Sequence, residues 1–77
     1  MRNRLIQAVK SYLQGNLDKH CANIENLLNN TVALAEHSDI VATIDKELDM
    51  LAGYEDKLNV LSKYFTHKVS EREVLNG

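Results

Sequence analysis

Apolar residues recur at steps of three and four through the second half of the 77-residue chain. Seven of the eight positions in this repeat are apolar and Glu47 is the exception: Ile40, Ile44, Glu47, Leu51, Tyr54, Leu58, Leu61 and Phe65. A seven-residue period places one stripe along an α-helix and suits packing against a neighbouring helix. Ser38 precedes the repeat as a good N-cap, and Asp39 suits the positive end of the helix dipole. The pattern predicts a helix over about 38–66.

A second apolar series, near the N-terminus, is spaced almost entirely by fours: Leu5, Val9, Leu13, Leu17, Cys21, Ile24 and Leu28. Each step of four rotates the stripe by about 40°, or by about 160° from Leu5 to Cys21. One straight neighbour could not cover that spiral. Either one helix over about 2–29 contacts different neighbours along its length, or the helix breaks near Gly15, with Asn16 as a new N-cap. We expect the continuous helix, because a helical glycine costs only about 1 kcal/mol.

The chain contains no proline, which permits long unbroken helices, and neither series alternates as a β-strand would. Residues 30–37 are expected to connect the helices. A capping box from Ser70 to Glu73 predicts a short helix at 70–75. The sequence therefore predicts one all-α domain over 1–77, built as a helical hairpin.

The chain is too small to bury a large core by itself. Burial of apolar surface is worth roughly 120 kcal/mol, and ordering the chain costs roughly 115 kcal/mol, so a monomer is marginal. We therefore expect homo-oligomerisation into a helical bundle, as a dimer or a larger assembly. Its interface is predicted to draw on apolar residues of both helices: Leu13, Leu17, Ile24, Ile44, Leu51, Tyr54, Leu58, Leu61 and Phe65.

The net charge of −2 combines two regions of opposite sign. In an antiparallel hairpin, residues 1–14 and 61–77 form a pole of net charge +4, and residues 15–60 carry −6. The cations proposed as a basic, anion-binding pole are Arg2, Arg4, Lys10, Lys63 and Lys68. The carboxylates of Asp45, Asp49 and Asp56 fall within about 40° of one another on a helix. They form either a solvated face or a docking face, and in the second case two hairpins could pair antiparallel, basic pole against acidic stripe, around a two-fold axis.

The reactive side chains do not form a recognisable site. His20 and Cys21 are adjacent and point about 100° apart on a helix, which makes a poor ligand pair. We expect His20 to be partly buried or at an interface. In the cluster Glu36–Asp39, helix capping accounts for Ser38 and Asp39, and adjacent residues cannot supply a catalytic triad. Glu47 either lies exposed at the edge of the apolar stripe, which we favour, or sets the register by pairing with a cation across an interface. The sequence predicts no catalytic residues, no metal site and no cofactor.

The favoured function is a non-enzymatic protein–protein interaction or structural module whose partner is itself, or another protein. The alternative is a small regulator that contacts nucleic acid through the basic pole, although a net charge of −2 disfavours a nucleic-acid partner. The lone Cys21 fits a reducing cytoplasm. The chain has no apolar run of the roughly 20 residues that a membrane span needs, so no membrane association is expected.

Part of the sequence resembles a group of phage proteins. The segments Glu36–Ile40, Glu47–Asp49, Tyr54–Leu58 and Lys63–Phe65 carry the resemblance, which covers about residues 36–65. They resemble small helical proteins encoded by T4-like phages of marine cyanobacteria. The resemblance implies a phage origin, a location in the host cytoplasm, and a role as a virion component or as a factor that binds a host protein. It implies no activity and no functional residues.

Overall fold

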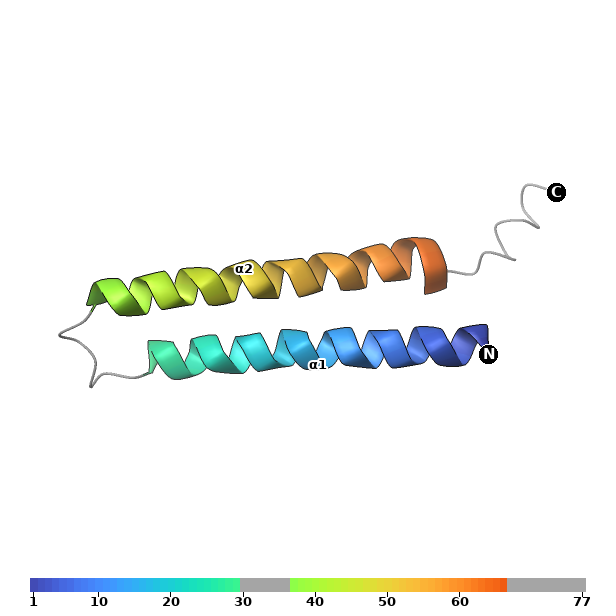
Figure 1. The fold of residues 1–77 in the computed structure, drawn as a ribbon, viewed down its shortest axis with the longest axis horizontal. Coiled ribbons are helices and arrows are strands. Elements are labelled where there is room, and N and C mark those ends of the chain that lie inside the picture. The colour runs from blue at the N-terminus through green and yellow to red at the C-terminus, as the bar shows by residue number, and fades with distance from the viewer. Residues whose placement is uncertain (30–36, 67–77) are drawn as a thin grey trace.

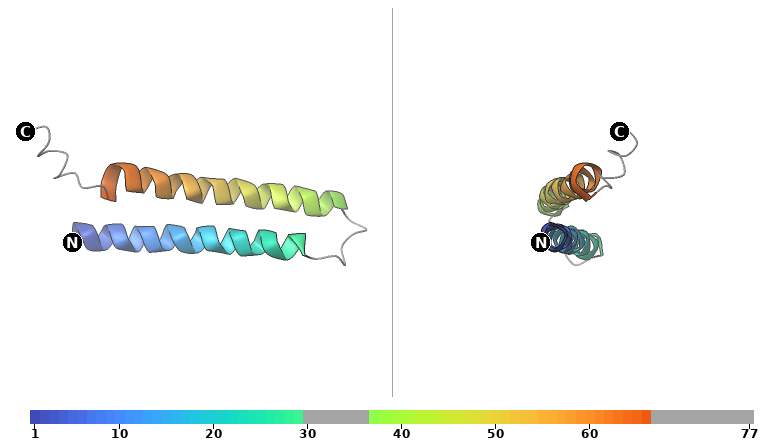
Figure 2. Two further views of the ribbon diagram at one scale, coloured as in Figure 1. Left: turned by 180° about the vertical axis from the view of Figure 1, so that it is seen from behind. Right: turned by 90° about the vertical axis from the view of Figure 1, so that its right-hand side faces the viewer.

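The computed structural model describes residues 1–29 and 37–66, and these form an antiparallel helical hairpin (Figure 1). Helix α1 spans Arg2–Leu28 and helix α2 spans His37–Leu61, followed by η2, a π-helical turn at Ser62–Thr66. The two helices lie side by side along their length in both side views, and the end-on view shows them adjacent (Figures 1 and 2). The described residues include no strand, which confirms the all-α hairpin.

The helix bounds differ little from the predicted ones. Helix α2 begins one residue before the predicted cap Ser38, and Asp39 lies in its first turn. The predicted connection lies outside the described residues except for His37, and so does the predicted helix at 70–75. No helix in the described ranges combines the length and the apolar character that crossing a membrane would require.

Helix α1 runs through Gly15 without a break, so the alternative of two shorter helices is wrong. A C′ glycine would adopt a positive φ angle, and no described residue does so. Asn16 is also not an N-cap, because its side-chain Nδ2 donates a hydrogen bond to the Tyr12 carbonyl oxygen one turn earlier, at 3.0 Å. The long helix therefore presents one continuous surface to α2.

The side of α2 that faces α1 is the predicted stripe. All seven repeat positions from Ile40 to Leu61 are half-buried, Glu47 among them. On α1, however, the inner side follows a spacing of seven rather than four, through Ile6, Leu13, His20 and Leu27. A period of 3.5 keeps one helix face turned toward a nearly straight neighbour, whereas a period of four rotates away from it.

The apolar series spaced by four therefore turns away from α2 at both ends of α1. Leu13 is buried near its middle, and Leu17 and Ile24 are half-buried. The other four members of that stripe are exposed: Leu5, Val9, Cys21 and Leu28. The expectation that one neighbour could not cover the whole spiral agrees with this arrangement.

The hairpin has one thin layer of buried residues. Among the described side chains, Leu13 and His20, each 6% exposed, are the two that count as buried. Many large apolar side chains are between 39% and 93% exposed: Met1, Leu5, Val9, Tyr12, Leu28, Val41, Leu48, Met50, Val60, Tyr64 and Phe65. Two helices provide a seam but not an enclosed core.

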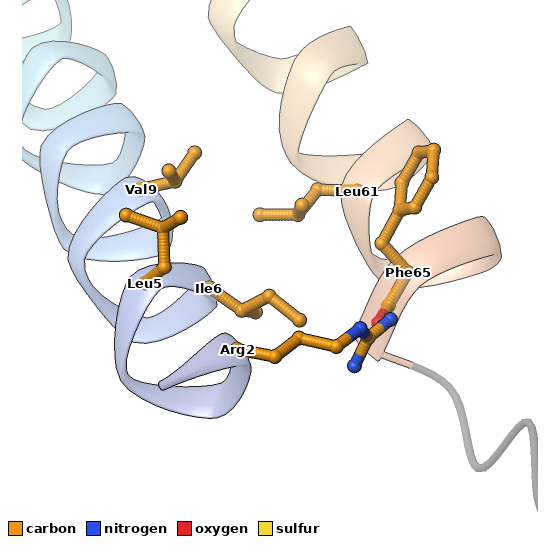
Figure 3. A pocket seen from close by; sticks show the side chains of 6 residues that line it. All are labelled: Arg2, Leu5, Ile6, Val9, Leu61 and Phe65. Carbon is orange, nitrogen blue, oxygen red and sulfur yellow. The ribbon is translucent and has the colours of Figure 1, made fainter.

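A side chain from α1 closes the open end of the hairpin, where Met1 and η2 lie (Figure 3). The Arg2 guanidinium Nη2 donates a hydrogen bond to the Phe65 carbonyl oxygen at 2.7 Å. Carbonyls in the last turn of a helix lack intrahelical donors, and a cation is favourable at this negative end. The contact fastens the start of α1 to the end of η2.

Candidate functional site

A polar layer interrupts the apolar seam near the middle of the hairpin. The His20 ring nitrogen Nδ1 on α1 lies 2.6 Å from the Glu47 carboxylate oxygen Oε1 on α2. The Asn23 side-chain Nδ2, one turn further along α1, donates to the same oxygen at 3.1 Å. An ionised carboxylate accepts hydrogen bonds only, so His20 Nδ1 carries the proton in this arrangement. We call His20, Asn23, Glu47 and Tyr54 the histidine layer.

Tyr54 completes the layer on the side of the open end. Its ring stacks on the His20 ring with centroids 5.7 Å apart and planes 15° apart. The Lys57 ammonium Nζ lies 4.9 Å from the Tyr54 ring centroid, within the range of a cation–π contact. The second His20 nitrogen, Nε2, is buried and has no hydrogen-bond partner within the described part of the chain. The layer is therefore satisfied on one side of the imidazole and unsatisfied on the other.

The pKa values of two groups in the layer are shifted in opposite directions. The pKa of Glu47 is lowered, mainly by the hydrogen bond from His20 and next by that from Asn23; partial burial acts against this. The pKa of the Tyr54 phenol is raised, mainly by burial and further by the nearby Tyr12 phenol. Glu47 is thus held as a carboxylate, and Tyr54 is held as a neutral phenol.

These contacts correct the interpretation of Glu47 that the sequence favours. Its side chain is 22% exposed and is bound across the seam, so it does not lie merely exposed at the edge of the stripe. The alternative was pairing with a cation across an interface; the partner in the structure is the His20 imidazole on the facing helix of the same chain. His20, expected to be partly buried or at an interface, is 6% exposed and lies against Glu47 in the seam.

The histidine layer has the chemistry of a register-setting contact. A single polar group in an apolar helix seam favours the one alignment in which it finds its partner. His20 Nδ1 and Asn23 Nδ2 both bind the Glu47 carboxylate, and neither contact involves a nucleophilic side chain. No group of three or more metal-ligating side chains gathers in residues 1–29 and 37–66.

The open end carries an apolar groove on the surface (Figure 3). Its first part, of about 220 Å³, lies between α1 and the end of α2 and is lined by Arg2, Leu5, Ile6, Val9, Leu61 and Phe65. A second part, of about 450 Å³, shares three of these residues and is lined by Val9, Leu13, Asp56, Lys57, Val60, Leu61 and Phe65. Both parts are shallow and open to solvent.

The residues predicted to form an interface fall into two groups. Leu13 is buried, and seven others are half-buried in the seam within one chain: Leu17, Ile24, Ile44, Leu51, Tyr54, Leu58 and Leu61. Phe65 is 50% exposed and lies at the groove, where its ring meets that of Tyr64 edge-on at a centroid distance of 6.3 Å. Most of the predicted interface residues are therefore used within one hairpin, and the apolar side chains that remain exposed to another chain are mostly different ones.

The cations of the predicted basic pole are not brought to one face. Arg2 points across the seam to Phe65, whereas Arg4, two residues later, points about 160° away from it. The Lys63 ammonium lies 5.3 Å from the Tyr64 ring centroid. Lys10 lines a shallow hollow on α1, and Lys68 is outside the described residues.

The acidic stripe lies on the outside of α2. Asp45, Asp49 and Asp56 are all exposed, and they project roughly opposite to the side that packs on α1. Asp56 also lines the larger part of the groove. The stripe is thus available to another molecule, or to solvent.

Sequence reasoning missed the polar and apolar residues that α1 places in the seam. Ile6, Asn16, Asn23 and Leu27 are half-buried there. The signal that could have found them is the seven-residue spacing of Ile6, Leu13, His20 and Leu27, which a search for apolar residues misses because His20 is polar.

Comparison of the chain with protein-family models, with curated proteins and with solved structures gives no match.

Proposed function

We propose that this chain is a non-enzymatic interaction or structural module, whose hairpin is completed by further copies of itself into a helical bundle. The observation that carries the proposal is the thin seam. Leu13 is the single buried apolar side chain among the described residues, and none of their side chains is less than 2% exposed. Larger bundles bury both sides of such a seam, which a two-helix hairpin leaves open.

The exposed apolar side chains support the same proposal. Apolar side chains that are exposed singly need no explanation, but the open end gathers several around one groove. Leu5 is 61% and Phe65 50% exposed there, and exposing such a cluster to water is unfavourable. Contact with another protein surface removes that cost.

The histidine layer supports a structural role rather than catalysis. Its hydrogen bonds join the two helices and fix their alignment at the level of His20 and Glu47. A fixed alignment presents the outer surfaces of α1 and α2 in a constant pattern, which specific assembly requires.

The phage resemblance over residues 36–65 adds an origin and a setting to the proposal. In this view the module is a virion component or a factor that binds a host protein, and it works in the host cytoplasm. The lone cysteine, Cys21, supports a reducing compartment.

The experiment is the molar mass of the full chain by light scattering, from dilute protein to tens of micromolar and from low to high salt. The proposal predicts a mass above the 8.7 kDa of one chain that grows with concentration. A mass of one chain at every concentration and salt would contradict it. A salt-dependent mobility shift with nucleic acid, abolished by Arg2→Ala and Arg4→Ala, would favour the alternative of a nucleic-acid regulator.

A further inference from the structure

We infer that copies of this chain associate head to tail, with one face of the hairpin seated on the opposite face of the next copy. The inference rests on the proposed self-association and specifies its surfaces. It also replaces the two-fold pairing considered from the sequence by a heterologous contact, which uses two different surfaces.

The hairpin has two broad faces, one on each side of the seam. We name the first the tyrosine face, after Tyr12; it includes Lys57, because Tyr12 and Lys57 both approach Tyr54. We name the second the cysteine face, after Cys21. Cys21 follows Tyr12 by nine residues and Leu48 precedes Lys57 by nine, and nine residues are about two and a half turns. Cys21 and Leu48 therefore lie on the side of the hairpin opposite to Tyr12 and Lys57.

Each face carries an apolar patch, and the two patches lie at opposite ends. On the tyrosine face, Leu5, Val9 and Tyr12 lie between the histidine layer and the open end, next to Phe65, and are 61%, 39% and 63% exposed. The patch on the cysteine face lies at the histidine layer and beyond it, toward the other end. There Leu28, Val41 and Leu48 are 62%, 65% and 48% exposed, and Cys21 is exposed between them.

The two faces also differ in charge. The charged residues within about 60° of the tyrosine face are three lysines and one acid: Lys19, Lys46, Lys57 and Asp39. Those on the cysteine face are four acids and two lysines: Asp18, Glu25, Asp45, Glu55, Lys10 and Lys63. A face of net charge +2 thus opposes a face of net charge −2 on the same hairpin. Pairing like faces would set charges of one sign together, whereas pairing unlike faces brings opposite charges together.

The geometry of the patches selects the same arrangement. When the tyrosine face of one copy lies antiparallel on the cysteine face of the next, the patch at one open end meets the patch at the far end of its neighbour. Helix α1 has 27 residues, so each face is about 40 Å long and about 20 Å wide, and full overlap covers about 800 Å² per copy. That area is what a stable protein–protein contact typically needs from each partner. A pair joined in this way leaves one tyrosine face and one cysteine face free, so growth continues into a ring or a filament.

The test uses two matched variants of the full chain. Leu5→Glu breaks the patch on the tyrosine face and Leu28→Glu breaks the patch on the cysteine face; both leucines are on α1 and are almost equally exposed. Circular dichroism first establishes that each variant keeps its helix content. Val41→Glu, near the start of α2, replaces Leu28→Glu if a carboxylate at the end of α1 reduces that content.

Light scattering then distinguishes the outcomes. The inference predicts that the unchanged chain grows beyond a dimer, that each variant alone is a monomer, and that an equal mixture stops at a pair of about 17 kDa, twice the mass of one chain. A closed two-fold dimer of the unchanged chain, or one variant that still dimerises while the mixture forms nothing new, would overturn the head-to-tail contact and leave self-association standing. A monomeric unchanged chain would overturn both.

Discussion

Replacing Leu13 by alanine should show how much of the stability of one hairpin lies in its seam. The change removes three carbons worth about 0.8 kcal/mol each when buried, so we expect it to cost about 2.4 kcal/mol. Leu13 is 6% exposed, so nearly all of this transfer free energy applies. No large cavity contribution is expected, because Leu13 lines a groove that is open to solvent and the vacated space can fill with water.

The assay is urea unfolding followed by circular dichroism, in protein dilute enough to be monomeric by light scattering. A Gly15→Ala background, with an expected gain of about 1 kcal/mol, offsets part of the cost. Leu13→Val is a milder form of the same change, with an expected cost of about 0.8 kcal/mol. Leu5→Ala is the matched control, because the same atoms are removed where the side chain is 61% exposed, and its cost should be about 1 kcal/mol. Equal costs at Leu13 and Leu5 would refute the placement of Leu13 in the seam.

Three further outcomes follow from particular residues. Gly15→Ala should stabilise the chain by about 1 kcal/mol, because Gly15 is helical and a Cβ there meets nothing within 4 Å; an unchanged urea midpoint would argue against a continuous α1. Because the pKa of Glu47 is lowered, its carboxylate stabilises the fold at neutral pH, and this contribution is progressively lost as the pH falls through the lowered value. The urea midpoint should therefore drop in acid, and Glu47→Gln should flatten that drop in a pH series. Arg2→Ala should cost about 1 kcal/mol by removing the hydrogen bond to the Phe65 carbonyl, and hydrogen exchange should show faster opening of η2 while the His20 amide keeps its protection.

The fold could be predicted from the sequence because the apolar pattern of α2 is almost uninterrupted. Its repeat from Ile40 to Leu61 is apolar at every position but Glu47, and a period of 3.5 has one physical reading, a helix packed along another helix. Continuity of α1 through Gly15 was also accessible, because the cost of one helical glycine is small.

The inner side of α1 was not accessible from its apolar residues. The apolar series from Leu5 to Leu28 winds around α1, whereas α2 packs along a nearly straight line on its surface. Helix α2 therefore contacts only the middle of the series, and it covers His20 while Cys21 stays exposed. A polar residue in a helix seam can be assigned to the seam only when its hydrogen-bond partner on the other helix is known. His20 and Glu47 each look like exceptions until the two helices are aligned, and then they explain each other.

The backbone conformation at the end of the second helix was the other feature that could not be predicted from the sequence. A continuous helix to about 66 and the observed change to a π-helical turn at Ser62 differ in backbone hydrogen bonding, not in apolar pattern. The contact from Arg2 to the Phe65 carbonyl depends on how far apart the helices lie at the open end, which no local signal encodes.

The most direct test of the central claim, that further copies of the chain complete the core, is the dependence of the unfolding midpoint on protein concentration. If association stabilises the hairpin, the temperature midpoint of the full chain rises steadily as the concentration increases over about a hundredfold range. The midpoint should also move together with the mass measured by light scattering. A midpoint that stays constant over the whole range would show that association adds no stability to the hairpin, and would contradict the account.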